Sequence, residues 1–414
     1  ESLALAAKAT STIQDHSLWT SRFLRNNEHL LAVWTTNGES MTAFNVAAPT
    51  ARVVDLMGNE RTERTRDGVL LLRASEDIQF VRGLNERAGQ FGALVSVETP
   101  ERIRPGEQAT IRMALRNPFG TASSVELDVS SSDNLVDYSA TVTVPPNGTL
   151  DVQATANLPA EATAGRKAVK VSVDWAGTTW TQPTELLVST VDPEAGPVGR
   201  WTFDEGTGTV AHDASGSNNN GAITGCRWVP GKQGTALAFG GGAAPEVGAG
   251  PGGDRTVNDL VVIPDAPSLD LPEEVTLAFW LKLTGDTGTW QFPVTKYLAD
   301  QVRNYGLYVR PDGFAPCFSA SFEGADYHHS DMGTSPNLND GNWHHLCATV
   351  SVLDQRIAVY VDGRLATESR SVPGSMLTND EPLRIGAGTN GIIDEVAVWP
   401  RALTAEEVRR LAKP

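Results

Sequence analysis

The sequence predicts an all-β protein built from three consecutive β-sandwich blocks. Short runs of β-branched and aromatic residues alternate with turns rich in Gly, Asn, Asp and Pro, and the 414 residues include 39 Gly and 24 Pro. Helical periodicity is scarce. Strands do not alternate with helices, which excludes a TIM barrel or a Rossmann unit within these residues. The length allows about two to four domains of ordinary size.

The composition excludes several classes of partner and site. The 33 Lys and Arg against 50 Asp and Glu give a net charge of −17, which argues against a nucleic-acid backbone or an anionic membrane surface as the main partner. No apolar run approaches the roughly 20 residues of a membrane span. The three cysteines, Cys226, Cys317 and Cys347, rule out a disulfide scaffold and offer no CxxC pair for zinc. A Cys317–Cys347 bridge and buried free thiols both remain open.

Residues 1–90 form the first block. An Ala- and Leu-rich segment (1–14) predicts a short helix, and it is followed by LLAVWTTNGE (30–39), a Val-Asp-Leu-Met-Gly-Asn turn (54–59) and a strand with apolar residues on both faces (69–72). In this order the motifs resemble the small β-sandwich that follows the catalytic barrel in many clan-A glycoside hydrolases. The resemblance implies that the catalytic carboxylates lie on a preceding barrel, so no catalytic residue is assigned.

Residues 91–190 form the second block, which ends at a Pro/Gly linker (191–198). PERIRPGEQATIRMALRNPFG (100–120) and VTVPPNGTLDVQATANLP (142–159) each combine alternating strands with tight turns. The block resembles the immunoglobulin-like spacers of bacterial extracellular proteins, whose fold is a sandwich of about seven strands. Trp175 and Trp180 flank a predicted hairpin, where packing is the favoured role and sugar stacking the minor alternative.

Residues 199–414 form the third block. Its motifs are GRWTFDEGTGTVAHDASGSNNNGAITG (199–225), VTLAFWLKL (275–283), GNWHHLCATVSVLDQRIAVYVDGR (341–364) and GIIDEVAVWPRALTAEEVRRLA (391–412). Within VTLAFWLKL the odd-numbered residues share one face, and Thr404 with Glu407 predicts a capped helix near the end. The motifs resemble a laminin-G-like domain of the concanavalin A-like jelly-roll class, interrupted by a Gly-rich insertion (240–253).

A calcium site is expected from this resemblance. Laminin-G-like domains often bind calcium through an Asp of the DASGSNNNG turn and the Asp of the Ile-Asp-Glu-Val strand, which are Asp213 and Asp394 here. Asn218 and Asn220 are expected to assist, since calcium favours carboxylate and amide oxygens. The alternative is a turn in which Asp213 and the Asn residues only cap backbone groups.

A carbohydrate site is the second expectation. Jelly-roll lectins stack a sugar ring on an aromatic side chain and bind its hydroxyls with planar polar groups. We assign Trp290, Tyr305, Tyr327 and His328 to such a site, because this fold places loops and concave-face strands there. Zinc is disfavoured, since adjacent histidines on a strand point to opposite faces. Residues 198–414 carry sixteen basic and twenty-six acidic side chains, which favours an uncharged or cationic glycan.

These features predict a non-catalytic, carbohydrate-binding and spacer region of a secreted or cell-surface, bacterial, polysaccharide-degrading glycoside hydrolase. No Gly-x-Ser-x-Gly elbow, HExxH or P-loop occurs, and Asp394-Glu395 is the nearest match to a glycosidase acid pair. The expected partners are a polysaccharide or oligosaccharide and a catalytic barrel of the same polypeptide, without nucleic acid or a membrane span. The alternatives are an adhesion or structural extracellular protein and a weakly active glycosidase or polysaccharide lyase.

Overall fold

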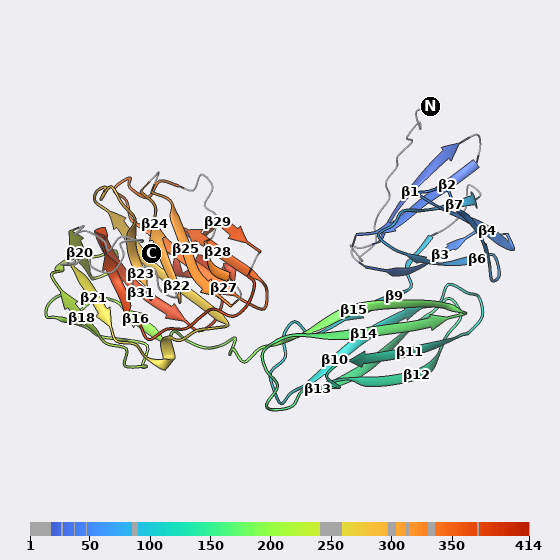
Figure 1. Cartoon of the computed structure of the whole chain (residues 1–414), viewed down its shortest axis with the longest axis horizontal. Helices are drawn as coiled ribbons and strands as arrows, with labels where there is room; N and C mark the ends of the chain where they lie inside the picture. The colour runs from blue at the N-terminus through green and yellow to red at the C-terminus, as the bar shows by residue number, and fades with distance from the viewer. Residues whose placement is uncertain are drawn as a thin grey trace. The chain divides into compact units, whose positions relative to one another are not determined.

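The fold is all-β, as the sequence predicts. The computed structural model describes residues 18–25, 28–36, 38–46, 48–84, 90–240, 259–296, 304–311, 314–323, 325–329, 336–370 and 372–413. These residues form thirty-one strands, one α-helix and one 3-10 turn (Figure 1). The helix predicted at 1–14 and nearly all of the Gly-rich insertion lie outside the described residues. Among the described residues no helix is long and apolar enough to cross a membrane.

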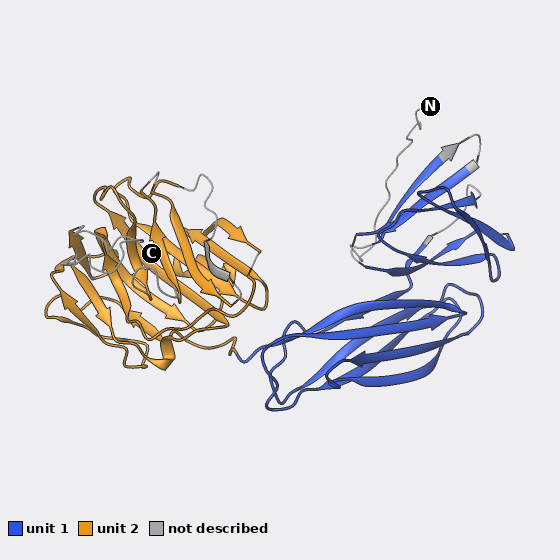
Figure 2. Cartoon of the chain, viewed as in Figure 1, with its two compact units in different colours: residues 1–190 blue, residues 191–414 orange. Residues whose placement is uncertain are grey.

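The chain divides into two compact units, residues 1–190 and 191–414 (Figure 2). The change of unit falls in the Pro/Gly linker. The first unit contains both N-terminal blocks, and the second unit contains the third block.

The first block of unit 1 folds into two sheets around a small core of Val, Leu and Phe side chains. One sheet has the order β1-β2-β7-β4-β5 and the other the order β6-β3-β8. The strands are β1 (Leu18–Arg25), β2 (Glu28–Thr35), β3 (Ser40–Asn45), β4 (Thr50–Asp55), β5 (Glu60–Arg64), β6 (Val69–Ala74), β7 (Gln79–Leu84) and β8 (Gln90–Ala93).

The second block of unit 1 also folds into two sheets, with orders β13-β10-β9 and β12-β11-β14-β15. Trp175 and Trp180 are buried at the predicted hairpin, which confirms a packing role. The Trp180 indole N–H donates to the Glu39 carbonyl at 2.9 Å and so ties this block to the first. The strands are β9 (Val95–Glu98), β10 (Gln108–Arg116), β11 (Ser123–Ser131), β12 (Asp137–Val144), β13 (Thr149–Asn157), β14 (Gly165–Trp175) and β15 (Thr178–Val188).

Unit 2 contains two eight-stranded antiparallel sheets that enclose one large core. The first, the β22 sheet, has the order β19-β20-β31-β22-β27-β28-β29, with β16 paired to β31. Its strands are β16 (Gly199–Trp201), β19 (Arg227–Pro230), β20 (Thr235–Gly240), β22 (Glu274–Leu283), β27 (His344–Ser351), β28 (Arg356–Val361), β29 (Arg364–Ser369) and β31 (Asn390–Trp399).

The second sheet of unit 2, the β23 sheet, has the order β17-β18-β21-β30-β23-β24-β25-β26. Its strands are β17 (Val210–Ala211), β18 (Gly221–Thr224), β21 (Leu260–Ile263), β23 (Gln291–Thr295), β24 (Gly306–Val309), β25 (Pro316–Phe322), β26 (Ala325–His329) and β30 (Leu383–Ala387). The 3-10 turn spans Pro267–Leu269.

The outer face of the β22 sheet is partly covered by α1 (Ala405–Leu411). The helix begins at the predicted capping box, in which the Thr404 side chain accepts from the Glu407 N–H and the Glu407 side chain accepts from the Thr404 N–H. Its Val408 packs on Ala278 and Cys347, which point out of the sheet. The helix therefore closes one side of a depression on this face.

The cysteines are free thiols. Cys317 is buried in the core between the sheets, whereas Cys347 is buried under α1 on the outer face of the β22 sheet. Burial, together with the nearby Asp259 carboxylate, raises the pKa of the Cys226 thiol to about 12, so this partly buried thiol is unreactive at neutral pH.

A buried ammonium joins three segments of unit 2. The Lys296 side chain is fully buried, and its Nζ donates to Asp265 Oδ1 at 2.7 Å and to Asp270 Oδ1 at 3.1 Å. It also donates to the Asn379 carbonyl at 2.7 Å. All three ammonium hydrogens thus have an acceptor, which satisfies the hydrogen-bonding requirement of a buried amino group.

Candidate functional site

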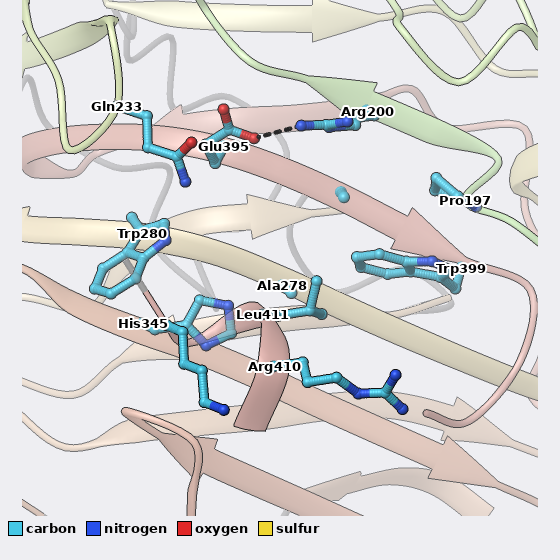
Figure 3. A pocket seen from close by; sticks show the side chains of 12 residues that line it. Pro197, Arg200, Gln233, Ala278, Trp280, His345, Glu395, Trp399, Arg410 and Leu411 are labelled. Atoms are coloured by element: carbon cyan, nitrogen blue, oxygen red, sulfur yellow. Dashed lines mark hydrogen bonds and ion pairs between the residues drawn. The ribbon is translucent and has the colours of Figure 1, made fainter. Parts of the chain in front are cut away.

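A pocket of about 370 Å³ lies on the outer face of the β22 sheet, beside α1 (Figure 3). The side chains come from four strands, the helix, two loops and the segment that follows the helix. They are Pro197, Arg200, Gln233, Ala278, Trp280, His345, Glu395, Ala397, Trp399, Arg410, Leu411 and Lys413. Its volume is at the lower end of the range of small-ligand sites.

The period of two in the strands explains why these residues face outward. On β22, Leu277 and Phe279 belong to the core between the sheets, so Ala278 and Trp280 point away from it. The strand pairing sets Ala278 of β22 opposite Ala397 of β31, with Trp280 and Trp399 further along in opposite directions. Figure 3 shows the two indoles at opposite ends of the pocket, with Ala278 between them. Two small residues flanked by two large ones produce the depression.

A β-bulge in β31 aims Glu395 at this pocket. Ile393 and Val396 both face the core although they are three positions apart, and the pairing with β22 shifts register here. Glu395 takes the left-handed backbone conformation with φ 49°, which costs a non-glycine residue about 1 kcal/mol or more. Its carboxylate pairs with the Arg200 guanidinium at 3.1 Å. Backbone strain held at a pocket is typical of a functional residue.

The turn before β20 brings two more polar groups to the site. Asp394 Oδ2 accepts from the backbone N–H groups of Lys232 at 2.8 Å and Gln233 at 3.0 Å. A Cβ at Gly231 would lie 2.6 Å from the same oxygen, so this close approach requires glycine. The turn places Gln233 in the pocket and the Lys232 ammonium 4.4 Å from the centre of the Trp280 ring. Asp394 thus acts as a positioning residue.

Burial perturbs two titratable groups at the site. His345 is 3% exposed, and burial lowers its pKa to about 4, so the imidazole is neutral at neutral pH. Its ring lies edge-on to Trp280, with centroids 5.2 Å apart, and its Nδ1 is buried and has no hydrogen-bond partner among the residues that the structure describes. For Asp394, burial and the adjacent Glu395 charge raise the pKa to about 6.

We expect Glu395→Gly to leave the folded state at least as stable as the wild type. Glycine adopts a positive φ without strain, which offsets the loss of a half-exposed ion pair worth at most about 1 kcal/mol. Glu395→Gln keeps the strain and loses the charge, so it is the matched control. Chemical denaturation of both variants checks this. A Glu395→Gly variant less stable than Glu395→Gln would contradict a strained bulge.

The predicted calcium residues act in two separate turns. Asp213 accepts from the N–H groups of Arg200, Ser215 and Asn219 and from the Ser215 hydroxyl, at 2.8–2.9 Å. Asn220 Oδ1 accepts from the Asp213 N–H, while Asn218 is exposed. Such hydrogen bonds are also expected if Asp213 and Asn220 only cap backbone groups of the turn. Asp394 holds the Lys232 turn and shares no hydrogen-bond partner with Asp213.

Within the described ranges, no group of three or more His, Cys, Asp or Glu side chains is arranged to hold a metal ion. That search covers only those four residue types, and the calcium site also invokes asparagine oxygens. Calcium therefore stays a prediction of the sequence.

The predicted sugar-binding aromatics lie in the β23 sheet. Tyr305 is fully buried, its hydroxyl donates to the Leu269 carbonyl at 3.0 Å, and it belongs to the inter-sheet core. Trp290 is half-buried, packs at the edge of the same core and against Phe292, and lies edge-on to Tyr308 with ring centroids 6.4 Å apart. Tyr327 and His328 belong to β26, but their side chains lie outside the described part. Full burial leaves Tyr305 unavailable to a sugar, whereas Trp290 keeps part of its surface exposed.

The pocket residues Trp280, Trp399 and Glu395 were not predicted. One signal was available: in VTLAFWLKL, Trp280 interrupts the non-core face of a strand with a large aromatic. Such a residue is either covered by another element or available to a ligand. Only the position of α1 decides between these roles, and the strand pattern does not contain that information.

Comparison with known proteins bears on this fold. A family model for the "Concanavalin A-like lectin/glucanases superfamily" matches residues 254–409. The C-terminal unit contains a concanavalin A-like domain. This confirms the jelly-roll class expected for the third block. The wider glycoside hydrolase context is not part of that match.

Two curated proteins are similar to part of this chain. They are the "Sushi, von Willebrand factor type A, EGF and pentraxin domain-containing protein 1" of mouse, 25% identical over 152 residues, and that of rat, 24% identical over 152 residues. Each match covers 33% of this chain and only 4% of the relative.

Solved structures show low similarity. The binding domain of botulinum neurotoxin DC in complex with SialylT is 11% identical with a TM-score of 0.39, over 52% of this chain and 50% of that one. A putative carbohydrate-binding protein of Bacteroides ovatus is 12% identical with a TM-score of 0.30, over 76% and 84% of the two chains. The pentraxin of Limulus polyphemus is 17% identical with a TM-score of 0.27, over 37% and 81%.

Proposed function

We propose that the concanavalin A-like domain binds carbohydrate in the pocket between Trp280 and Trp399. One observation carries this proposal: two indoles bracket a floor of small residues that is edged by planar polar side chains. Aromatic rings contact the apolar C–H face of a sugar, and planar polar groups bind its hydroxyls. Gln233, Glu395 and Arg200 supply such groups here. The half-buried Trp399 is the more accessible stacking surface, since Lys232 lies over Trp280.

The proposed biological role is targeting. The chain acts as the non-catalytic binding and spacer part of a secreted polysaccharide-degrading glycoside hydrolase, with the catalytic barrel on the same polypeptide. A weak sugar contact raises the local concentration of substrate for a tethered catalytic domain. The resemblance of residues 1–90 to a barrel-associated sandwich supports this context. A parent open reading frame that encodes no barrel before this segment would contradict it.

We also propose that calcium binds at Asp213 and Asp394, because the laminin-G-like resemblance implies a site there. Thermal melting with added calcium and with a chelator tests it. If calcium is bound, the chelator lowers the melting temperature of the C-terminal unit. If both carboxylates bind only protein N–H and hydroxyl groups, the two curves coincide and the proposal fails.

Trp399→Ala is expected to weaken glycan binding at least about tenfold, equivalent to about 1.4 kcal/mol, because stacking is lost while the core is intact. The full chain is screened against soluble polysaccharides by affinity electrophoresis, and the variant is titrated against the best binder by calorimetry. Trp19→Ala, which removes an exposed tryptophan of the first unit stacked on Trp34, is the control. Equal affinities for Trp399→Ala and the wild type would overturn this site.

A further inference from the structure

The charge of the pocket is opposite to that of the chain. Among the described lining residues, three cationic side chains (Arg200, Arg410 and Lys413) stand against one carboxylate, that of Glu395. Arg200 is already paired with Glu395. The neutral His345 adds no charge at neutral pH. The pocket is therefore locally positive, although the protein carries a net charge of −17.

Two of these cations are available to a ligand. Within the described part of the chain, Arg410 and Lys413 form no ion pair, whereas their neighbours Arg401 and Arg409 pair with Glu407 and Glu406. Figure 3 shows the Arg410 side chain along the pocket side nearest α1. A third cation, Lys232, lies over the Trp280 ring without a carboxylate partner in the same described set.

We propose that the ligand of this pocket is a sugar that carries a carboxylate. The inference rests on the proposed function, since it specifies the class of sugar for the same site. A guanidinium binds a carboxylate with two parallel hydrogen bonds, and an ammonium adds a point charge. An acidic sugar can place its ring against Trp399 and its carboxylate at Arg410 and Lys413. Glu395, held by its bulge and by Arg200, remains available as a hydroxyl acceptor.

From the sequence, the overall acidity of the domain favours an uncharged or cationic glycan, which is the opposite of the preference proposed for this pocket. That expectation treated charge as uniform over 217 residues (198–414), whereas binding depends on charges within a Debye length of about 8–10 Å. The remaining acidic surface disfavours long polyanions elsewhere on the domain. It thereby confines an acidic glycan to this pocket.

A matched ligand pair tests the carboxylate directly. A uronic acid oligosaccharide and the same oligosaccharide with its carboxyl groups reduced to alcohols are titrated into the full chain, with sialyllactose and lactose as a second pair for a terminal acidic sugar. We expect at least tenfold tighter binding of an acidic member than of its neutral partner, and a decrease in this preference with added salt. The pair that shows the preference identifies the source of the carboxylate.

The double variant Arg410→Gln/Lys413→Gln is expected to reduce the affinity for the acidic sugar to that for its neutral partner. Arg409→Gln, one position away on the same helix, is the control and is expected to change neither. Arg410 can also complement the last turn of α1 electrostatically, and an unchanged melting temperature separates that role from ligand binding. Equal affinity for the acidic and neutral members overturns the carboxylate inference and leaves carbohydrate binding intact. Binding of no sugar at all overturns both.

Discussion

Lys296→Met is expected to destabilise the C-terminal unit by about 3 kcal/mol. The substitution keeps the length of the side chain but removes the cation that, among the described residues, pairs with both Asp265 and Asp270, which are about 30% exposed. Breaking a buried pair from one side costs roughly 3–5 kcal/mol because the remaining charge is uncompensated, and the partial exposure of the aspartates places the cost at the lower end.

The experiment follows the unfolding transition of residues 191–414 within the full chain. For a unit of this size, about 3 kcal/mol corresponds to a decrease in melting temperature of about 6–12 °C. Lys282→Met, on the outer face of β22 and without an ion pair among the described residues, is the control and is expected to shift the midpoint by less than about 2 °C. A Lys296→Met variant that melts with the wild type would show that the cluster contributes no net stability.

His345→Gln is expected to make the folded state more acid-resistant, by about 3 kcal/mol at pH 4 relative to pH 7.5. Burial lowers the pKa of His345 to about 4, against about 6.5 in the unfolded chain. Between these values the unfolded state binds more protons, so this histidine reduces stability as the pH falls from 6.5 to 4. Glutamine fills a similar space and does not titrate.

The contribution of Asp394 to the pH dependence of folding stability has the opposite sign. Burial raises its pKa to about 6, so between pH 6 and about 3.8 the folded state binds more protons and gains stability as the pH falls. The two contributions nearly cancel in the wild type over the shared window. The measurement is therefore the difference between the pH–stability profiles of His345→Gln and wild type, obtained by urea denaturation. Parallel profiles from pH 7.5 to pH 4 would mean that His345 protonates freely in the folded protein.

The architecture was predictable because strands leave a clear periodic pattern. The alternation in VTLAFWLKL identified Leu277 and Phe279 as core, and the Thr404–Glu407 spacing identified the capped helix; both are confirmed. A period of two shows which residues share a face. It does not show which face a second sheet covers, and for that reason Tyr305 could not be assigned to the core in advance.

The site depends on long-range relations that sequence patterns do not encode. Glu395 faces the pocket only because a bulge adds a residue to β31 opposite β22. Asp394 is predicted to bind calcium, and the structure adds that its carboxylate accepts hydrogen bonds from a turn 161 residues earlier in the chain. The local positive charge arises where the last helix meets the sheet. Each of these depends on which strands become neighbours.

The most direct test of the central claim is a footprint of the tryptophans with a bound glycan. Hydroxyl-radical labelling of the full chain, read by mass spectrometry, is compared with and without a saturating oligosaccharide. The pocket on the β22 sheet predicts that labelling of the half-buried Trp399 falls on binding, while labelling of Trp290 on the β23 sheet is unchanged. Protection of Trp290 with unchanged labelling of Trp399 would contradict the account and place the sugar on the opposite sheet.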